Sequence, residues 1–401
     1  MAERVAQPTR PQAGGRPPTS GAFPALRALV DARGTAIAAW AAAVLVPFLA
    51  SRFALAYIGY LAVMRLGDDR GRIDPTGMPW VNAWSRHDGM WYVSVAEYGY
   101  GVETQGNSNL AFAPLLPMLM KAAAAVFGRD DAPAYVVAGL VVSNLALIVA
   151  LTLFLLLARL DHDEASARRG VLYLLLFPTT LFLSALYPES LFLALTLGSF
   201  YCARRRAWVG SGVLAAVATL ARPHGLLLAL PLAIEYLAQR GWRLRDIRLD
   251  AVAVALPLVA HGLWLGYLAL TTGDPFASYA AQAMWGRRLV PPWVTIANFF
   301  APGAAVARLD LIYPAVMLLL VIASWKLLRP SYAAYAVLFY LLPLSSAVIQ
   351  SQGRFALTLF PAFLVLALAG RSATFDRVYV LVSSALAAFF MALFAVGGWV
   401  G

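Results

Sequence analysis

The chain has 401 residues, of which 61% are apolar and only 13% are charged, whereas a soluble domain carries roughly 45–50% apolar and 25% charged residues. Apolar runs of membrane-spanning length recur throughout the sequence without alternation, which excludes a soluble globular protein and a transmembrane barrel. The net charge of +11 does not indicate a nucleic-acid partner here, because basic cytoplasmic loops explain it. The single Cys202 excludes an intrachain disulfide. The sequence therefore predicts an all-α polytopic protein embedded in membrane lipids.

The N-terminal residues 1–34 are rich in Pro, Gly, Ala and Arg and show no apolar period, which is typical of a disordered tail. The apolar run from Thr35 to Met64 is too long for the core of a cleaved signal peptide, so we expect it to be the first membrane span. The basic tail places the N-terminus in the cytoplasm. Residues 35–401 are expected to form one transmembrane domain in the cell membrane.

Ten further spans are expected, which gives eleven crossings and an external C-terminus. With these spans, most basic residues fall in cytoplasmic segments. Residues 67–134 and 271–308 then form two large external loops, provided that 111–127 does not cross. Two prolines and Lys121 in that segment indicate a helix lying in the interface. The ten spans are 135–158, 170–187, 190–203, 207–221, 225–238, 250–270, 309–328, 331–350, 355–370 and 378–396.

The segment after the first span combines an acid, two basic residues and several aromatic residues. It reads Trp84-Ser85-Arg86-His87-Asp88-Gly89-Met90-Trp91-Tyr92. Asp88 has no apolar packing role there, so it is a candidate general base for an attacking hydroxyl. The aromatic residues Trp91 and Tyr92 are candidates for holding the loop at the interface or stacking on a sugar. A simple aromatic belt is the alternative.

Three further polar segments fall at external turns, on the same side as Asp88. They are Tyr187-Pro188-Glu189, Arg222-Pro223-His224 and Gln352-Gly353-Arg354. The charge rule alone chose the topology, so this convergence independently indicates an external polar site, since charges at membrane depth mark function. Each segment also has a structural alternative, namely arginines that reach lipid headgroups, a helix-start acid, and a turn histidine.

The residue types indicate phosphate chemistry with a hydroxyl acceptor. Arg222 and Arg354, with His224 and either Arg86 or His87, suit a phosphate, because guanidinium binds phosphate in a bidentate manner. Glu189, Tyr187 and Gln352 are candidates for positioning the sugar or the arginines. A phosphate in a membrane beside one base predicts a polyprenyl-phosphate sugar donor and inversion at the sugar carbon.

No cofactor is expected, since the sequence contains no P-loop, dinucleotide fingerprint or metal-ligand cluster. A divalent ion shared by Asp88 and Glu189 stays open, although hard cations prefer more oxygen ligands.

The ordered set of these segments resembles the PIG-V-type mannosyltransferases, integral-membrane glycosyltransferases of the GT-C fold. The family pattern usually has Trp where this chain has His87. The similar segments, in chain order over about residues 80–365, are Trp84-Ser85-Arg86-His87-Asp88-Gly89, Trp91-Tyr92, Gly99-Tyr100, Phe112-Ala113-Pro114-Leu115-Leu116-Pro117, Leu183-Ser184-Ala185-Leu186-Tyr187-Pro188-Glu189-Ser190, Arg222-Pro223-His224-Gly225 and Gly353-Arg354-Phe355.

The resemblance implies a GT-C fold with juxtamembrane helices in the first external loop. It implies transfer of mannose from a polyprenyl- or dolichyl-phosphate-mannose donor to a hydroxyl of a lipid or glycan acceptor, with Asp88 as the catalytic residue on the extracytoplasmic face. We further expect the loop 271–308 to help form the acceptor or lipid entrance. The residues expected there are Asp274, Trp285, Arg287, Arg288 and Trp293.

Three alternatives remain open at this point. The donor sugar is arabinose or glucose in one, and the chain is a non-catalytic subunit in another. The third is a lipid or sugar transporter, which often carries an internal repeat around a midplane site. The sequence shows no repeat, and its polar residues gather at one face, which favours the enzyme.

Overall fold

The computed structural model describes residues 34–67, 76–104, 106–301 and 311–400. The chain divides into two units, Met1–Ala42 and Ala43–Gly401. In the first unit, residues 34–40 are helical. The predicted disordered tail 1–34 lies, but for Gly34, outside the described residues. All that follows concerns the second unit, whose described residues are mostly helical.

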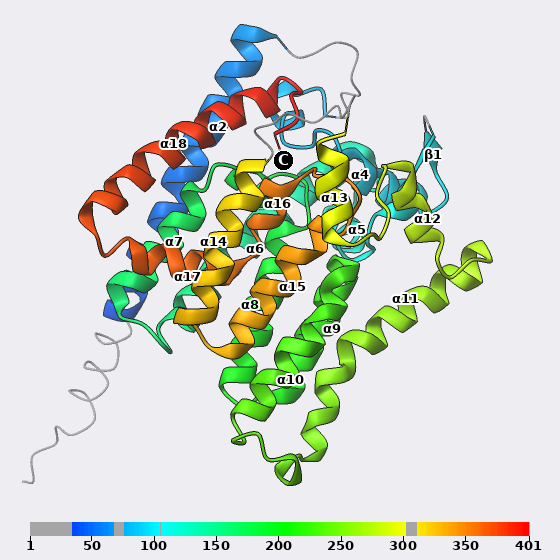
Figure 1. Ribbon diagram of the computed structural model, residues 1–401. Helices are drawn as coiled ribbons and strands as arrows, with labels where there is room; N and C mark the ends of the chain where they lie inside the picture. The colour runs from blue at the N-terminus through cyan, green and yellow to red at the C-terminus, as the bar shows by residue number, and fades with distance from the viewer. Residues whose placement is uncertain (1–33, 68–75, 105, 302–310, 401) are drawn as a thin grey trace, which may run out of the picture. The chain divides into compact units, whose positions relative to one another are not determined.

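The described part of the second unit contains one small antiparallel sheet, in which Glu103 of β1 (Glu103–Thr104) pairs with Ser108 of β2 (Asn107–Ser108). The helices, shown in Figure 1, are α2 (Val46–Leu66), α3 (Pro79–Asn82), α4 (Gly89–Tyr98), α5 (Leu115–Val126), α6 (Ala132–Ala158), α7 (Glu164–Leu176), α8 (Glu189–Arg204), α9 (Trp208–Ala221), α10 (Ala229–Ala238), α11 (Leu256–Thr272), α12 (Ala277–Met284), α13 (Pro292–Phe299), α14 (Ile312–Leu327), α15 (Pro330–Leu344), α16 (Gln352–Ala356), α17 (Phe360–Ala369) and α18 (Ala373–Ala395). Shorter helical turns are η1 (Ala41–Leu45), η2 (Asn109–Ala111), η3 (Thr180–Leu183), η4 (Pro223–Leu228), η5 (Leu244–Asp246) and η6 (Leu249–Ala255).

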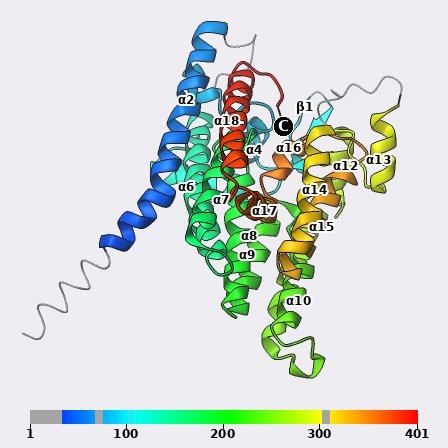
Figure 2. The same cartoon turned by 60° about the vertical axis from the view of Figure 1, so that its left-hand side comes forward.

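The all-α prediction is confirmed, and each of the eleven predicted spans contains a helix in its described part. Within the described residues, four helices are long and apolar enough to cross a membrane, namely Gly34–Leu66, Ala132–Ala158, Leu249–Thr272 and Ala373–Ala395. Shorter apolar helices account for most other spans, and the number of crossings stays a prediction. α2 packs along α18, and α18 also contacts α7, as both ribbon views show (Figures 1 and 2).

The predicted interfacial helix is α5, which starts directly after Pro114. Its Leu116 and Met120 are buried in a cluster with Tyr135 of α6, whereas Met118 and Lys121 on other sides are exposed. A short helix with one buried side fits a juxtamembrane position in the first external loop.

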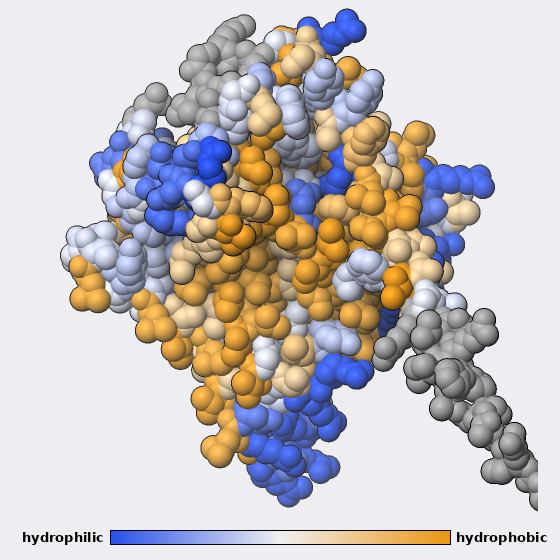
Figure 3. Space-filling view, turned by 180° about the vertical axis from the view of Figure 1, so that it is seen from behind, coloured by the Kyte–Doolittle hydropathy of each residue, from blue (hydrophilic) through white to orange (hydrophobic). Residues whose placement is uncertain are grey.

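The described surface is divided between apolar and hydrophilic regions. Figure 3 shows a broad apolar area with hydrophilic residues gathered beyond it at opposite ends. On α6, the exposed side chains Val137, Val141, Leu145 and Val149 recur every four residues, so they form one stripe along the helix. An apolar stripe without a protein partner suits contact with lipid chains.

The span expected at 170–187 is shorter than predicted, because α7 ends at Leu176. Pro178 follows, and the residue before a proline leaves the helical region. The chain then turns through η3 and enters α8 at Glu189. Arg52 of α2 stabilises this break: its guanidinium donates to the carbonyls of Leu175 and Thr180, both at 3.0 Å. It thus satisfies carbonyl groups that the end of a helix leaves without partners.

Replacing Arg52 with Ala is expected to lower the thermal unfolding midpoint by several degrees. The change leaves two buried carbonyls unpaired, at a cost of about 1–3 kcal/mol each. Thermal unfolding in detergent micelles measures the effect, with Arg65→Ala as the control, because Arg65 lies exposed on the same helix. An unchanged midpoint for Arg52→Ala would mean that the break is held by packing alone.

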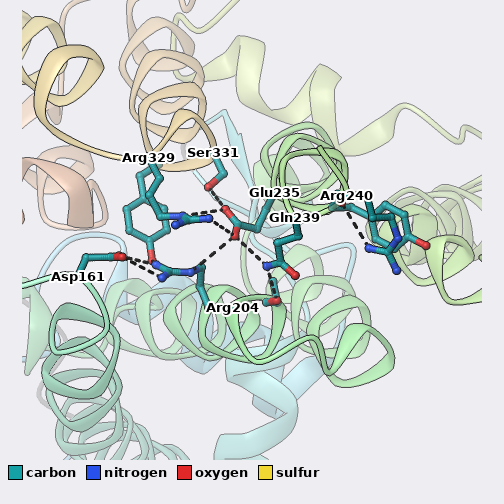
Figure 4. Close-up of polar contacts among 10 residues, drawn as sticks. Asp161, Arg204, Glu235, Gln239, Arg240, Arg329 and Ser331 are labelled. Atoms are coloured by element: carbon teal, nitrogen blue, oxygen red, sulfur yellow. Dashed lines mark hydrogen bonds and ion pairs between the residues drawn. The ribbon is translucent and has the colours of Figure 1, made fainter. Parts of the chain in front are cut away.

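A second buried charge joins α8, α10 and α15 (Figure 4), at the end of the unit remote from α4 and α16 (Figure 1). Glu235 of α10 accepts from Ser331 at 2.5 Å and from Arg329 at 3.0 Å, and it lies 3.6 Å from Arg204. Arg204 in turn forms an ion pair with Asp161, which precedes α7. One buried carboxylate therefore joins three helices and the connection between α6 and α7.

Glu235→Gln is expected to destabilise the protein by about 3 kcal/mol. Breaking a buried ion pair costs roughly 3–5 kcal/mol, and the low end applies because Arg329 is 35% exposed and partly screened by solvent. Denaturation of the purified protein measures the free energy of unfolding. The control is Asp246→Asn, which alters an exposed acid in η5. Equal stability of the two variants would contradict a structural role for Glu235.

Candidate active site

A cavity of about 790 Å³ lies where α4, α12, α16 and the segment after α18 come together. Figure 1 shows these elements at one end of the long helices α8 and α9. The cavity is lined by polar and aromatic side chains in a mainly apolar wall, as is usual for small-molecule sites. Its charged and imidazole side chains are His87, Asp88, Arg222, His224, His261, Arg287, Arg288 and Arg354.

Four charged residues from distant parts of the chain form a continuous chain of ion pairs at the cavity. Arg354 Nη1 binds Asp88 Oδ2 at 2.6 Å, and Arg354 Nε lies 3.0 Å from Glu189 Oε1. The same Glu189 oxygen lies 3.2 Å from Arg222 Nη2. Glu189 is fully buried and does not line the cavity, so it acts from behind to hold the two arginines in place.

Local backbone structure places Asp88 at the cavity. The chain turns at His87, whose φ of 55° is in the left-handed region that His tolerates better than most residues. α4 then starts at Gly89, where an added Cβ would lie 3.4 Å from the carbonyl oxygen of Leu186. Leu186 also donates its N–H to the carbonyl of Trp84 at 2.9 Å. These contacts fix the motif against the segment that leads into α8.

The basic side chains at the cavity are only partly neutralised by the described residues. Arg354 has two acidic partners, and Arg222 shares one of them. Among described side chains, Arg287 has one polar partner, Ser351, whose Oγ accepts from Nη2 at 3.3 Å. Burial and the nearby Arg354 lower the pKa of Arg287 to about 10. A bound anion would offset both effects, so this part of the cavity favours a negatively charged ligand.

Three of the basic side chains at the cavity share one aromatic neighbour, Phe355. Arg222 Cζ lies 4.9 Å and Arg287 Cζ 5.9 Å from the centre of the Phe355 ring, and the His224 ring centre lies 6.0 Å from it. Arg222 Nη1 is buried and has no hydrogen-bond partner among the described residues. Arg222, His224 and Arg287, called the cation cluster below, therefore gather around Phe355 with free donor capacity.

An aromatic wall lies on another side of the cavity. Trp91 stacks on Phe112 with ring centres 5.9 Å apart, and Trp285 meets both rings edge-on at about 6 Å. Trp285 belongs to the predicted loop 271–308 and Trp91 to the first external loop. The two segments therefore contact each other at this side of the cavity, and the entrance itself stays a prediction.

The structure brings most of the predicted site residues together. His87, Asp88, Trp91, Tyr92, Arg222, His224 and Arg354 all line the cavity. Tyr187 lies behind it, with its ring centre 5.2 Å from Arg354 Cζ and its hydroxyl donating to the carbonyl of Arg86. Tyr187 and Glu189 thus contact the arginine and the motif rather than the cavity space.

Two predicted assignments differ from the geometry. Arg86 Nη2 donates to the carbonyl of Ala395 at 3.2 Å, at the end of α18, and Arg86 does not line the cavity. Gln352 is buried at the start of α16, also outside the lining. A divalent ion between Asp88 and Glu189, which the sequence left open, would have to compete with Arg354, which is bound to both carboxylates.

The loop 271–308 contributes only part of what was expected. Trp285, Arg287 and Arg288 line the cavity, whereas Asp274 does not, and Trp293 is 70% exposed outside it. Trp399 also lines the cavity and was not anticipated. No motif around it in the sequence marks it, and its place depends on contacts with residues more than 200 positions away.

Comparison with known proteins agrees with this geometry. The family described as Mannosyltransferase (PIG-V) matches residues 71–249. This range includes the Asp88 motif, Glu189 and Arg222. Among curated proteins, none matches the sequence.

Two solved structures align with this chain, and of these ArnT is similar in fold. ArnT from Cupriavidus metallidurans aligns at a TM-score of 0.51 and 15% identity, over 88% of this chain and 76% of ArnT. The Archaeoglobus fulgidus oligosaccharyltransferase aligns at 0.45 and 11% identity, over 87% of this chain. This chain spans only 55% of that protein's length.

The ordered motifs, the family match and the ArnT-like arrangement of helices agree with one another. Over residues 71–249 the chain therefore matches the family described as Mannosyltransferase (PIG-V), and its fold is similar to that of ArnT.

Proposed function

We propose that this protein transfers mannose from a polyprenyl-phosphate donor to a hydroxyl of a lipid or glycan acceptor, with inversion at the sugar carbon. The observation that carries the proposal is the cavity itself. Asp88 and a partly unneutralised cation cluster open into the same space, and Arg354 connects them. A base and a phosphate site are the two parts that this reaction requires.

The cation cluster would hold the donor phosphate. Guanidinium groups bind phosphate oxygens in a bidentate manner and stay charged as the leaving group gains charge. Arg222 and Arg287 both have donor capacity that no described residue uses. The likeness to ArnT supports a lipid-linked phosphate, since that protein was solved bound to undecaprenyl phosphate.

Asp88 would act as the general base. Arg354 binds its Oδ2, and Oδ1 has no described partner, so one oxygen remains available to an acceptor hydroxyl. In the proposed step, the hydroxyl oxygen forms a bond to the sugar carbon while the bond from that carbon to the phosphate oxygen breaks. The hydroxyl proton passes to Asp88, and the polyprenyl phosphate leaves as an anion.

The extracytoplasmic face is proposed from the distribution of basic residues. The connections at the end opposite the cavity are strongly basic, with Arg204, Arg205 and Arg206 in one turn and four arginines in 239–249. The positive-inside rule places that end in the cytoplasm. The cavity would then face the other side of the membrane, where polyprenyl-phosphate sugars serve as donors when no nucleotide sugar is present.

The donor sugar is tested directly with purified protein in lipid nanodiscs. We would supply polyprenyl-phosphate-linked mannose, arabinose and glucose, each radiolabelled, with lipid extract as acceptor. Transfer of mannose at least ten times faster than of the other sugars is expected. Preferred transfer of arabinose or glucose would keep the enzyme class but overturn the donor, and turnover of none would overturn the function.

Trp285 and Trp293 form a matched pair for the entrance, because only Trp285 lines the cavity. Trp285→Ala is expected to raise the KM for acceptor several-fold, since stacked aromatic pairs contribute about 0.5–1.5 kcal/mol each. Trp293→Ala should leave all kinetic constants unchanged. Initial-rate kinetics with varied acceptor measures both, and equal behaviour of the two variants would remove Trp285 from the entrance.

A further inference from the structure

His87 and Trp399 form an aromatic corner beside Asp88. Their ring centres lie 5.1 Å apart with an interplanar angle of 84°, an edge-to-face contact. Both residues line the cavity together with Asp88, which follows His87 in the sequence and directly precedes α4. The Trp399 ring also lies 5.7 Å from Arg354 Cζ, so the arginine that binds Asp88 contacts the corner too.

The corner is built by contacts between the Asp88 motif and the segment that follows α18. Arg86 Nη2 donates to the carbonyl of Ala395, and His87 Nε2 lies 3.4 Å from the carbonyl oxygen of Gly398. Phe182 supports Trp399 from behind with ring centres 5.9 Å apart. Arg86 and His87 therefore hold the segment that carries Trp399 against the Asp88 motif.

The corner has an unused hydrogen-bond donor. The indole Nε1 of Trp399 is buried from solvent and has no partner among the described residues. A buried donor without a partner is costly, and most tryptophan N–H groups in such places find one. A ligand hydroxyl against the indole would supply it.

The proposed reaction decides which substrate lies here. In a displacement with inversion, the attacking hydroxyl and the leaving phosphate lie on opposite sides of the sugar carbon. The base must be on the side of the attacking hydroxyl. Arg222 and Arg287 gather around Phe355, whereas His87 and Trp399 adjoin Asp88 and Arg354. The aromatic corner thus belongs to the base, and the cation cluster to the leaving phosphate.

We propose that His87 and Trp399 form an acceptor subsite that takes a sugar ring, so that the acceptor presents a saccharide hydroxyl to Asp88. The CH face of a pyranose packs on the indole, and a neighbouring ring hydroxyl accepts from Nε1. This inference rests on the proposed transfer reaction, because the position of the acceptor follows from it. It makes Trp399 a residue that selects the acceptor class.

The test uses saturation-transfer NMR on protein in nanodiscs, with methyl α-D-mannopyranoside as the probe and glycerol as a hydroxyl control without a ring. Measurements are made without donor, and again with polyprenyl-phosphate-mannose on the Asp88→Asn background, where turnover is blocked. The variants are Trp399→Ala, Trp399→Phe and Trp325→Ala. Trp325 is an exposed tryptophan of α14 outside the cavity and serves as the matched control.

The proposal predicts saturation of the ring CH protons of the probe, with and without donor, and little for glycerol. Trp399→Ala should weaken probe affinity about 2–10-fold, as expected for loss of one aromatic contact. Trp399→Phe should weaken it less, because the ring stays and only the Nε1 donor is lost, and Trp325→Ala should keep it. Absence of saturation, or saturation unaffected by Trp399→Ala, would overturn the subsite. Displacement of the probe by the donor would contradict an acceptor subsite and would assign this site to the sugar of the donor.

The two proposals fail separately. If the wild-type protein does not bind or turn over polyprenyl-phosphate-mannose, the proposed function fails, whatever the probe shows. If it transfers mannose and the acceptor KM is the same in wild type and Trp399→Ala, the function stands and the acceptor subsite is wrong. A raised acceptor KM with unchanged donor KM supports both.

Discussion

Asp88→Asn is expected to reduce sugar transfer by about 10²–10⁴-fold, the range that a positioned general base contributes. The amide has the shape of the carboxylate but cannot accept the proton of the attacking hydroxyl. Arg354 keeps its second partner, Glu189, at 3.0 Å, so the fold around the cavity should persist. The rate of label transfer from polyprenyl-phosphate-mannose at matched protein level measures the loss.

Glu103→Gln is the control for this change, because Glu103 is an exposed acid in β1, in the same segment between α2 and α6. Its transfer rate should equal that of wild type. Donor binding by Asp88→Asn should also be close to wild type, since the proposed phosphate site is the cation cluster. If Asp88→Asn transfers sugar at more than a tenth of the wild-type rate, Asp88 is not the base.

Arg287→Ala is expected to weaken donor binding about 10–100-fold, because hydrogen bonds to charged groups contribute about 1.5–3 kcal/mol. Thermal stability should hardly change. Among described side chains, Arg287 has only Ser351 as a polar partner, so little native structure depends on it. Binding of radiolabelled polyprenyl phosphate to the nanodisc protein measures the affinity.

Arg245→Ala provides the comparison, since Arg245 is exposed in η5 at the opposite end of the unit. It should bind polyprenyl phosphate like wild type. Unchanged affinity in Arg287→Ala together with a loss in Arg222→Ala would confine the phosphate to Arg222 and His224. Unchanged affinity in both variants would contradict the cation cluster as the phosphate site.

The sequence predicted the helices well because membrane spans are long apolar runs, a property that each run carries by itself. The largest difference is the end of α7, while the spans 331–350 and 355–370 differ less, because α15 ends at Leu344 and α17 starts at Phe360. Residues 181–186 are apolar enough to continue a span, yet Pro178 ends the helix and Arg52 binds the carbonyls of the break. The proline could be read from the sequence. The contact with the arginine could not, because that arginine belongs to a helix more than 120 residues away.

The sequence could predict that Asp88, Glu189, Arg222 and Arg354 gather at one site. The prediction required only the side of the membrane on which each residue lies. Positive-inside topology placed all four at the same end, and the ion pairs join them. Topology does not determine side-chain direction. Arg86 and Asp88 are two positions apart, yet one binds the end of α18 and the other opens into the cavity.

Arg287 and Trp399 show what sequence reasoning could not reach. Arg287 and Arg288 are neighbours of the same type, and only packing buries one more than the other. Trp399 follows a helix far from the motif in sequence and meets it through contacts with His87 and Phe182. His87 contacts this tryptophan, so an aromatic partner is supplied to the motif from elsewhere in the chain.

The most direct test of the account is the anomeric configuration of the transferred sugar. Purified wild-type protein in nanodiscs would be given polyprenyl-phosphate-mannose and lipid extract, and the product linkage determined by NMR. One carboxylate base facing a phosphate leaving group predicts a single displacement and a product with the configuration opposite to that in the donor. Retention would require a covalent sugar intermediate on a nucleophile, and it would contradict the assignment of Asp88 as a base.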